Sequence, residues 1–263
     1  MAVAAVIRGR PGRVSPVLAV QAATLLTLWA IWEAVAASGL IYRGVVPSFV
    51  AILRALVQML GTSQFWADCA VTVAEVVAAT LLGSALGVLA GIAVGSSRWL
   101  ARAFEPFLHY LAATPKVVFL PVIMVLAGVG PSSKVVLGAL SCFFPMAISI
   151  AVGVRGIDPV LLRLSRSLRL SGVQRVRTIV LPSLVAPVFI GLRLALGIAT
   201  VGCLVSELKL ANSGLGFEAI QAYNHFQVPE MYAVILVIFV LVAAGNAGLA
   251  ALSRRVAPVR ARQ

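Results

Sequence analysis

Four ionisable side chains stand inside stretches that are otherwise apolar, and these side chains could act on a solute within a membrane. They are Glu75, Lys116, Arg193 and Glu207. A charged group is costly in hydrocarbon, so such residues usually face a partner or a water-filled cavity on a solute or ion pathway. We therefore expect all four to line or gate a translocation path. For Glu75 the alternative is a shallow position near the outer surface, where the carboxylate stays hydrated.

Lys116 lies between two prolines, Pro115 and Pro121, in an apolar stretch over residues 104–128. Each proline removes a backbone donor, and the freed carbonyls need partners in protein or in a water-lined cavity. The pattern predicts a broken membrane helix beside a solute path, with Lys116 facing a cavity. A proline kink that serves packing alone is the alternative.

Arg193 belongs to an apolar stretch that we expect to span the membrane over residues 182–205. At 1.5 Å per residue, it would lie roughly 16 Å from the start of this helix, near the bilayer centre. Glu207 would project within about 40° of the same helix face at 100° per residue. We therefore expect Arg193 to avoid lipid and to share the path with Glu207.

Residues for other kinds of chemistry are absent from the sequence. No GxxxxGK[ST] phosphate loop occurs, which excludes nucleotide hydrolysis by that mechanism. Cys69, Cys142 and Cys203 are too widely spaced for a metal motif, and His109 and His225 are isolated. We expect no metal, no cofactor bound by this chain and no enzymatic activity of its own.

Composition identifies the class of protein that must position these residues. The 263 residues are 61% hydrophobic and 11% charged, with a mean hydropathy of +1.06. Such a chain is an all-α polytopic membrane protein, and its net charge of +13 indicates topology rather than nucleic-acid binding. Six transmembrane helices are expected, over residues 17–41, 70–94, 104–128, 135–154, 182–205 and 232–252. A short amphipathic helix over 49–60 would lie at the interface, and 212–232 would be a polar connection.

The charge distribution orients these helices. Most of the 21 lysines and arginines fall in the N-terminal tail, the 97–104 turn, the 155–182 loop and the C-terminal tail, whereas Lys134 is among the few in external segments. The positive-inside rule then places both termini in the cytoplasm. We divide the chain into a tail with the first helix (1–46), a core (47–252) and a cytoplasmic tail (253–263).

Small residues indicate where two of the helices pack. Gly83, Gly87, Gly91 and Gly95 follow one another at intervals of four. This spacing puts them on one helix face, where the backbone of another helix can approach closely.

The cytoplasmic loop carries an unusual concentration of arginine, including Arg163, Arg166 and Arg169. Asp158 and Pro159 can start one amphipathic helix, and we expect Gly172 to break the chain before a second helix that Pro182 stops. This interfacial hairpin either docks a partner or only sets topology.

The hairpin resembles the coupling loop of binding-protein-dependent ABC importer permeases. Counted back from Leu181 and Pro182, Arg163, Leu164 and Ser165 stand where Glu-Ala-Ala is usual, and Arg169 stands where Gly is usual. The resemblance implies that the loop docks on an ATPase subunit. Arg166 and Gly172 would belong to the same docking surface. The departures from the usual residues suggest a divergent or paired partner.

Two longer stretches are similar to the nitrate, sulfonate and taurine branch of this family: SSRWLARAFEPFLHYLAATPKVVFLPVIMVLAGVGPSSKVVL and GLRLALGIATVGCLVSELKLANSGLGFEAI. In this branch Glu75 stands where relatives commonly have Arg. The resemblance implies the type I importer permease fold, in the bacterial inner membrane. It also implies a dimer with a second copy or a paralogue, two ATPases that bind ATP and Mg, and a periplasmic or lipid-anchored solute-binding protein.

Two other functions remain open at this point. An ion-coupled secondary transporter would use Glu75, Lys116 and Arg193 as coupling charges, although no convincing internal repeat relates the halves of the chain. A membrane scaffold would leave Lys116 and Arg193 to structural ion pairs. Neither the solute nor the identity of the second permease follows from the sequence.

Overall fold

The computed structural model describes residues 16–38 and 45–256, and within these ranges the chain is helical and contains no strand. Of the tail arginines that we used to orient the chain, Arg254 and Arg255 lie in the last turn of the final helix, and those of the N-terminal tail and those at 260 and 262 lie outside the described residues. The elements in chain order are α1 (Pro16–Ser38), α2 (Phe49–Leu60), α3 (Ser63–Ser96), α4 (Arg98–Ala113), η1 (Lys116–Phe119), α5 (Leu120–Ala127), α6 (Pro131–Arg155), α7 (Pro159–Ser167), α8 (Gly172–Arg175), η2 (Val176–Val180, a π turn), α9 (Leu181–Leu210), α10 (Leu215–Asn224) and α11 (Val228–Val256).

Among the described residues, five helices are long and apolar enough to cross a membrane: α1, α3, α6, α11 and the run from Gly172 to Lys209. A sixth crossing is the broken segment formed by α4 and residues 116–127, whose two parts bend by 92°. The six predicted crossings are therefore found when this bent pair counts as one. The break lies at the predicted prolines, since Pro115 precedes η1 and Pro121 stands in the first turn of α5.

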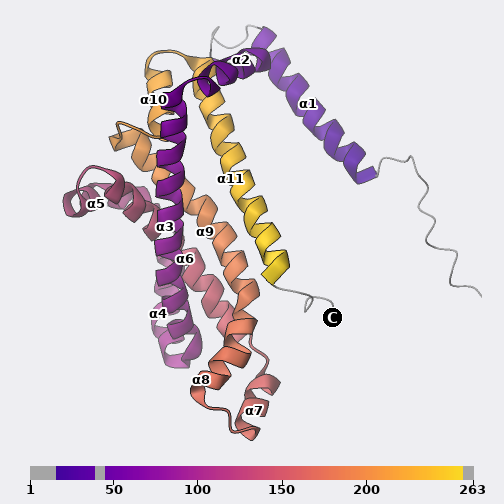
Figure 1. Ribbon diagram of the computed structural model, residues 1–263, viewed down its shortest axis with the longest axis vertical. Helices are drawn as coiled ribbons and strands as arrows, with labels where there is room; N and C mark the ends of the chain where they lie inside the picture. The colour runs from indigo at the N-terminus through magenta and orange to yellow at the C-terminus, as the bar shows by residue number, and fades with distance from the viewer. Residues whose placement is uncertain (1–15, 39–44, 257–263) are drawn as a thin grey trace, which may run out of the picture.

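The core of the bundle is α3 packed along α6, with α9 against both (Figure 1). The four glycines of α3 make this close approach possible. A Cβ on Gly91 would lie 2.5 Å from the carbonyl oxygen of Ala147, and one on Gly87 would lie 2.8 Å from that of Phe143. Gly83 and Gly95 meet the backbone of α6 in the same way. Backbone contact of this kind is how membrane helices gain packing energy.

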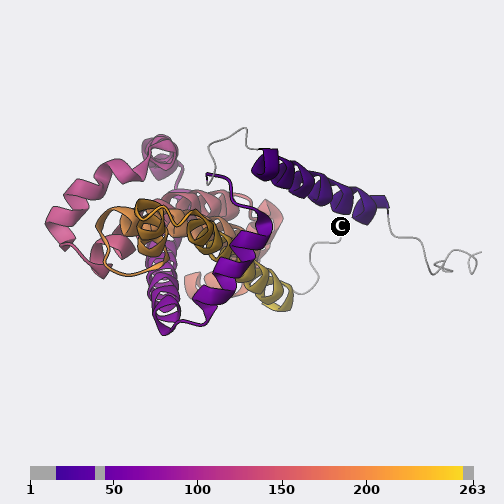
Figure 2. The same ribbon diagram turned by 90° about the horizontal axis from the view of Figure 1, so that it is seen from above.

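Helix α1 stands apart from the bundle, on the opposite side from the bend between α4 and α5 (Figures 1 and 2). It joins the rest at its outer end, where Trp32 donates a hydrogen bond to the carbonyl of Pro47 and packs edge-on against Tyr232. The backbone amide of Phe49 donates to the Glu33 carboxylate at 3.2 Å, so this acid supports the start of α2.

Several predicted helix limits were wrong. The second crossing begins at Ser63 rather than residue 70, and the fourth begins at Pro131 rather than residue 135. The polar connection over 212–232 contains α10. Hydropathy marks the part of a helix that lies in hydrocarbon, whereas these helices continue into polar residues that are buried against protein, such as Asp68. The result is a layer of buried polar groups at the outer end.

Candidate functional site

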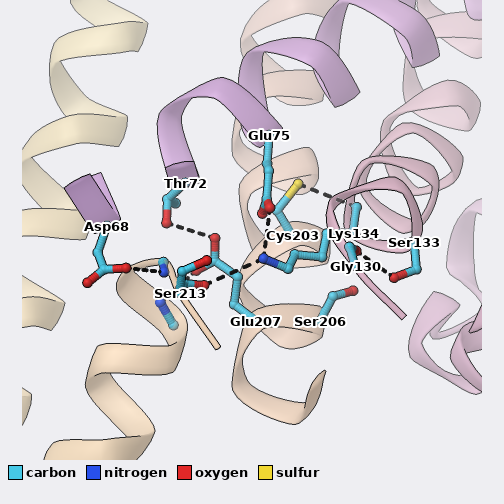
Figure 3. A network of polar contacts seen from close by, with 12 residues as sticks. Asp68, Thr72, Glu75, Gly130, Ser133, Lys134, Cys203, Ser206, Glu207 and Ser213 are labelled. Atoms are coloured by element: carbon cyan, nitrogen blue, oxygen red, sulfur yellow. Dashed lines mark hydrogen bonds and ion pairs between the residues drawn. The ribbon is translucent and has the colours of Figure 1, made fainter. Parts of the chain in front are cut away.

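A buried polar network joins the outer ends of α3, α6 and α9 to the loop before α10 (Figure 3). We call it the outer network: Asp68, Thr72, Glu75, Lys134, Glu207 and the backbone of residues 213–216. Lys134 Nζ lies 2.8 Å from Glu75 Oε1, and both side chains are about 95% or more buried, with exposures of 3% and 5%. Lys134 also donates to the carbonyl of Ser213 at 3.5 Å.

Glu207 is fully buried and anchors the start of α10. Its Oε1 accepts a hydrogen bond from the Thr72 hydroxyl at 2.7 Å, and its Oε2 accepts one from the Gly216 amide at 2.6 Å. Thr72 in turn accepts from the amide of Leu215, and Asp68 accepts from the amide of Gly214 at 2.6 Å. Side chains of α3 and α9 thus satisfy the first amides of α10.

Glycine is required at two positions of this loop. Gly214 has φ +108°, a conformation that only glycine adopts easily, and a Cβ there would lie 2.6 Å from the Glu207 carboxyl. A Cβ on Gly216 would meet the same side chain. The loop therefore closes directly onto the Glu207 carboxylate.

These contacts exclude one alternative and correct two expectations. Glu75 is not hydrated at a shallow position, because α3 starts earlier and buries it beside Lys134. Lys134 is not in an external turn, because α6 begins at Pro131. Glu207 is enclosed by Thr72 and Gly216 and does not share an environment with Arg193, which is exposed.

Sequence reasoning missed Asp68 and Thr72, although a signal was present. Asp68, Thr72 and Glu75 recur at the spacing that places polar groups on one helix face. A polar stripe on an apolar helix predicts buried partners. In the structure the cationic partner is Lys134, which pairs with Glu75.

A second feature is a cavity of about 530 Å³ between α4, α6 and α9, which we call the membrane cavity. Its lining is mostly apolar, and Lys116 supplies its cation. Lys116 Nζ donates to the carbonyl of Ala112 and lies 5.4 Å from the centre of the Phe144 ring. The cavity also lies beside Pro145 and Pro187, where helix interiors lose backbone bonds. Lys116 thus faces a cavity, as the interrupted helix predicts.

Arg193 lies on α9, between the cavity-lining residues Ile190 and Leu194. Its side chain is exposed and has no ion-pair partner within the described part of the chain. An uncompensated guanidinium in the middle of an apolar helix needs water or another protein surface.

The third feature is the cytoplasmic hairpin, residues 156–182. The carboxylate of Asp158 accepts from the amide of Val160 at 2.7 Å and caps α7. Arg169 has φ 50°, in the left-handed region that favours glycine, at the position where the resemblance predicts Gly. Ser171 and Gln174 form a capping box that starts α8.

Two predictions for the hairpin were wrong. Gly172 does not break the chain, because the turn falls at Arg169 and Ser171, and Gly172 starts α8 with room around it. Pro182 does not stop the second helix, because it occupies the first turn of α9, where no backbone donor is needed. The second arm of the hairpin is therefore the cytoplasmic end of the fifth crossing.

The hairpin presents mixed apolar and basic side chains to solvent. Leu164, Leu168, Val173 and Leu181 are 51%, 62%, 78% and 52% exposed. Arg163, Arg166 and Arg169 are also exposed, whereas Ser165 is buried and donates to the carbonyl of Leu162. Exposed apolar surface of this extent marks a site for another protein.

Across the described residues, no group of three His, Cys, Asp or Glu side chains could hold a metal ion, and Cys69, Cys142 and Cys203 are free and buried. The acids of the outer network are engaged with Lys134, Thr72 and backbone amides instead.

Comparisons with known proteins agree with this architecture. The taurine transport system permease protein TauC of Escherichia coli is 29% identical over 89% of this chain and 87% of its own length. SsuC of Bacillus subtilis, named for aliphatic sulfonates transport, is 29% identical over 81% of this chain and 77% of its own length. The nitrate import permease protein NrtB of Synechococcus elongatus is 29% identical over 60% of this chain and 57% of its own length.

A solved structure with the same fold is the MetNI methionine ABC transporter in inward-facing conformations. The match has a TM-score of 0.60 and 20% identity, over 78% of this chain and 97% of that one. The model of the family described as "Binding-protein-dependent transport system inner membrane component" matches residues 83–258, which include the membrane cavity, the hairpin and α10. The chain therefore belongs to this family, as the membrane-embedded permease subunit of an ABC importer.

Proposed function

We propose that this permease imports a small sulfonate, taurine, nitrate or a related solute across the bacterial inner membrane, through a path that includes the membrane cavity. Relatives named for these solutes support the solute class. The observation that carries the proposal is Lys116, a cation facing a cavity of about 530 Å³ within the membrane region.

Charge placement favours this path over one through the outer network. Glu75 would repel an anion, but its carboxylate is paired with Lys134 and buried away from the cavity. Lys116 lines the membrane cavity, and Arg193 lies on α9 next to the lining residue Leu194. A second permease subunit, a copy or a paralogue, would cover Arg193 and complete the path.

The same placement disfavours an ion-coupled secondary transporter. That alternative needs coupling charges that can exchange an ion, yet Glu75 is paired with Lys134, Lys116 contacts Ala112 and Phe144, and Arg193 is exposed. The three groups do not form one site.

The energy of ATP hydrolysis would be transmitted to the permease through the hairpin. Two ABC ATPases that bind ATP and Mg would dock on its exposed apolar and basic side chains, above all Arg163, Leu164, Arg166, Arg169 and Leu181. Because α8, η2 and α9 form one run over 172–209, a push on the hairpin passes directly to Arg193 and the cavity wall. A periplasmic or lipid-anchored binding protein would deliver solute at the opposite end.

Uptake of labelled taurine, an alkanesulfonate and nitrate by the purified complex in proteoliposomes tests the path. We expect Lys116→Met to reduce ATP-driven uptake of the anionic solute at least tenfold, whereas Lys116→Arg retains most of it. Equal uptake by Lys116→Met and the unaltered protein would remove Lys116 from the path.

Deletion of residues 158–171 tests the coupling. The protein should still insert into the membrane, because the deleted residues lie outside the crossings, but it should not retain an ATPase during purification in mild detergent. Mass spectrometry of the purified complex would also identify the second permease. Normal uptake by the deletion variant would contradict the coupling role.

A further inference from the structure

A basic hollow of about 740 Å³ lies at the cytoplasmic end of the bundle, between the start of α4, the ends of α3 and α6, and the hairpin. This end is the lower one in Figure 1, where α4 begins beside α7 and α8. We call it the cytoplasmic hollow. It is separate from the membrane cavity and is lined by a different set of residues, which includes Ser97, Arg98, Arg102, Glu105, Arg155 and Arg175.

The charges of the cytoplasmic hollow are not balanced. Four arginines from three elements face one carboxylate, Glu105, and Arg155 already binds that carboxylate with contacts of 2.7 and 3.0 Å. Arg98, Arg102 and Arg175 have no ion-pair partner within the described residues. Arg98 and Arg102 also stand one turn apart on α4, where like charges repel each other.

Arg175 supplies a second observation that points to a ligand. Its Nε is buried from solvent and has no hydrogen-bond partner. A buried donor without an acceptor is costly. The donor belongs to the wall of the hollow, so an acceptor placed there would satisfy it.

We propose that the cytoplasmic hollow binds a phosphate group. Guanidinium groups match phosphate oxygens in paired hydrogen bonds, and several arginines around one hollow can share a single anion. The amides at the start of α4 add positive potential at the same place. Ser97 caps this helix through a weak 3.4 Å contact to the amide of Leu100, so other amides of the first turn remain available.

The phosphate can come from an anionic lipid or from a soluble phosphate. Trp99, in the first turn of α4, is 72% exposed, and tryptophan at a helix end is typical of the membrane interface. Basic pockets between membrane helices on the cytoplasmic side bind lipid headgroups. This position makes an anionic phospholipid the expected source.

The site would have a consequence for transport. Arg175 belongs to the hairpin, whereas Arg98 and Arg102 belong to the start of the broken crossing. One phosphate held by these residues would tie the hairpin to α4 and set how firmly the hairpin is held before an ATPase docks.

Native mass spectrometry of the full-length permease in detergent tests the proposal, with phosphatidylglycerol, phosphatidylcholine and inorganic phosphate as probes. Affinity for phosphatidylglycerol should fall about fivefold for each arginine removed, in Arg102→Gln and Arg175→Gln. Arg177→Gln is the matched control, because Arg177 is two residues away, exposed and outside the hollow. Arg175→Lys should keep most of the affinity, and thermal melting of every variant should match the parent.

Competition between the probes distinguishes an anionic lipid from a soluble phosphate as the ligand. Competition by millimolar inorganic phosphate would identify a soluble phosphate, and retention of phosphatidylglycerol against it would identify the lipid. Equal affinities of Arg175→Gln and Arg177→Gln, or no preference for phosphatidylglycerol over phosphatidylcholine together with no binding of inorganic phosphate, would overturn the proposal. Loss of the co-purifying ATPase in Arg175→Gln with unchanged lipid affinity would also overturn it, because the acceptor would then be a group of the ATPase.

Discussion

Charged side chains are paired differently at the two ends of this bundle. At the outer end, Asp68, Glu75, Lys134 and Glu207 are buried and bind one another, Thr72 or backbone amides. At the cytoplasmic end, the arginines of the hairpin and of α4 are exposed or lack an acid. Each charged group of the outer network has a partner within the chain, although the second oxygen of Glu75, Oε2, has none. The arginines of the cytoplasmic end need partners from outside the chain. This difference fits the coupling that we propose, in which an ATPase acts on the hairpin from the cytoplasm.

The largest effect should come from removing one member of the buried ion pair. Lys134→Met leaves Glu75 unpaired in the interior and should lower stability by about 3–5 kcal/mol, the usual cost of breaking a buried pair. Thermal melting of the purified permease measures the change.

Lys209→Met is the matched control, because Lys209 is exposed on α9. The double variant Glu75→Gln, Lys134→Met should recover much of the lost stability. Equal melting temperatures of Lys134→Met and Lys209→Met would show that the Glu75–Lys134 pair does not stabilise the outer end.

Glycine substitutions compare the two ends directly. Gly214→Ala places a side chain at φ +108° and against the Glu207 carboxyl, and should cost about 1–3 kcal/mol from backbone strain alone. Gly172→Ala meets nothing within 4 Å at an ordinary φ and should be neutral or slightly stabilising. Chemical denaturation in detergent would measure both, and a larger loss from Gly172→Ala would reverse the comparison.

The comparison also explains what the sequence could predict. Hydropathy and proline spacing located the crossings and the break beside Lys116, because both are local properties. The partner of Glu75 was hidden, because Lys134 is distant in sequence and the start of α6 was placed too late. The turn at Arg169 was missed for another reason: an arginine in a left-handed conformation gives no local signal, and Gly172 gave a false one.

Arg169→Gly should have a smaller and opposite effect. Its left-handed backbone at φ 50° costs an L-residue about 1 kcal/mol or more, which glycine avoids. The substitution should raise the stability of the hairpin by up to that amount, partly offset by the freedom that glycine gains in the unfolded chain.

Hydrogen exchange of the 156–175 amides would measure this change. Arg166→Gly is the control, because it makes the same substitution inside α7, where glycine weakens a helix. Faster exchange in Arg169→Gly than in the parent would mean that the arginine side chain holds the turn.

The smallest effect concerns Glu218 on α10, outside the membrane crossings. Burial raises the pKa of this carboxyl above its usual value, and the charges of Asp68 and Glu230 raise it further. The folded protein therefore holds the Glu218 proton more tightly than the unfolded chain does. The stability of the outer end should fall as the pH rises from the unfolded pKa through the raised folded pKa.

Glu218→Gln should remove this part of the pH dependence and leave the protein slightly more stable at neutral pH. Melting curves from pH 4 to 8 would show it as a flatter profile than that of the parent. Glu33→Gln, at the start of α2, serves as a carboxylate control away from α10. A steeper profile in Glu218→Gln would mean that the ionised carboxylate is stabilised within the outer end, which would contradict a raised pKa.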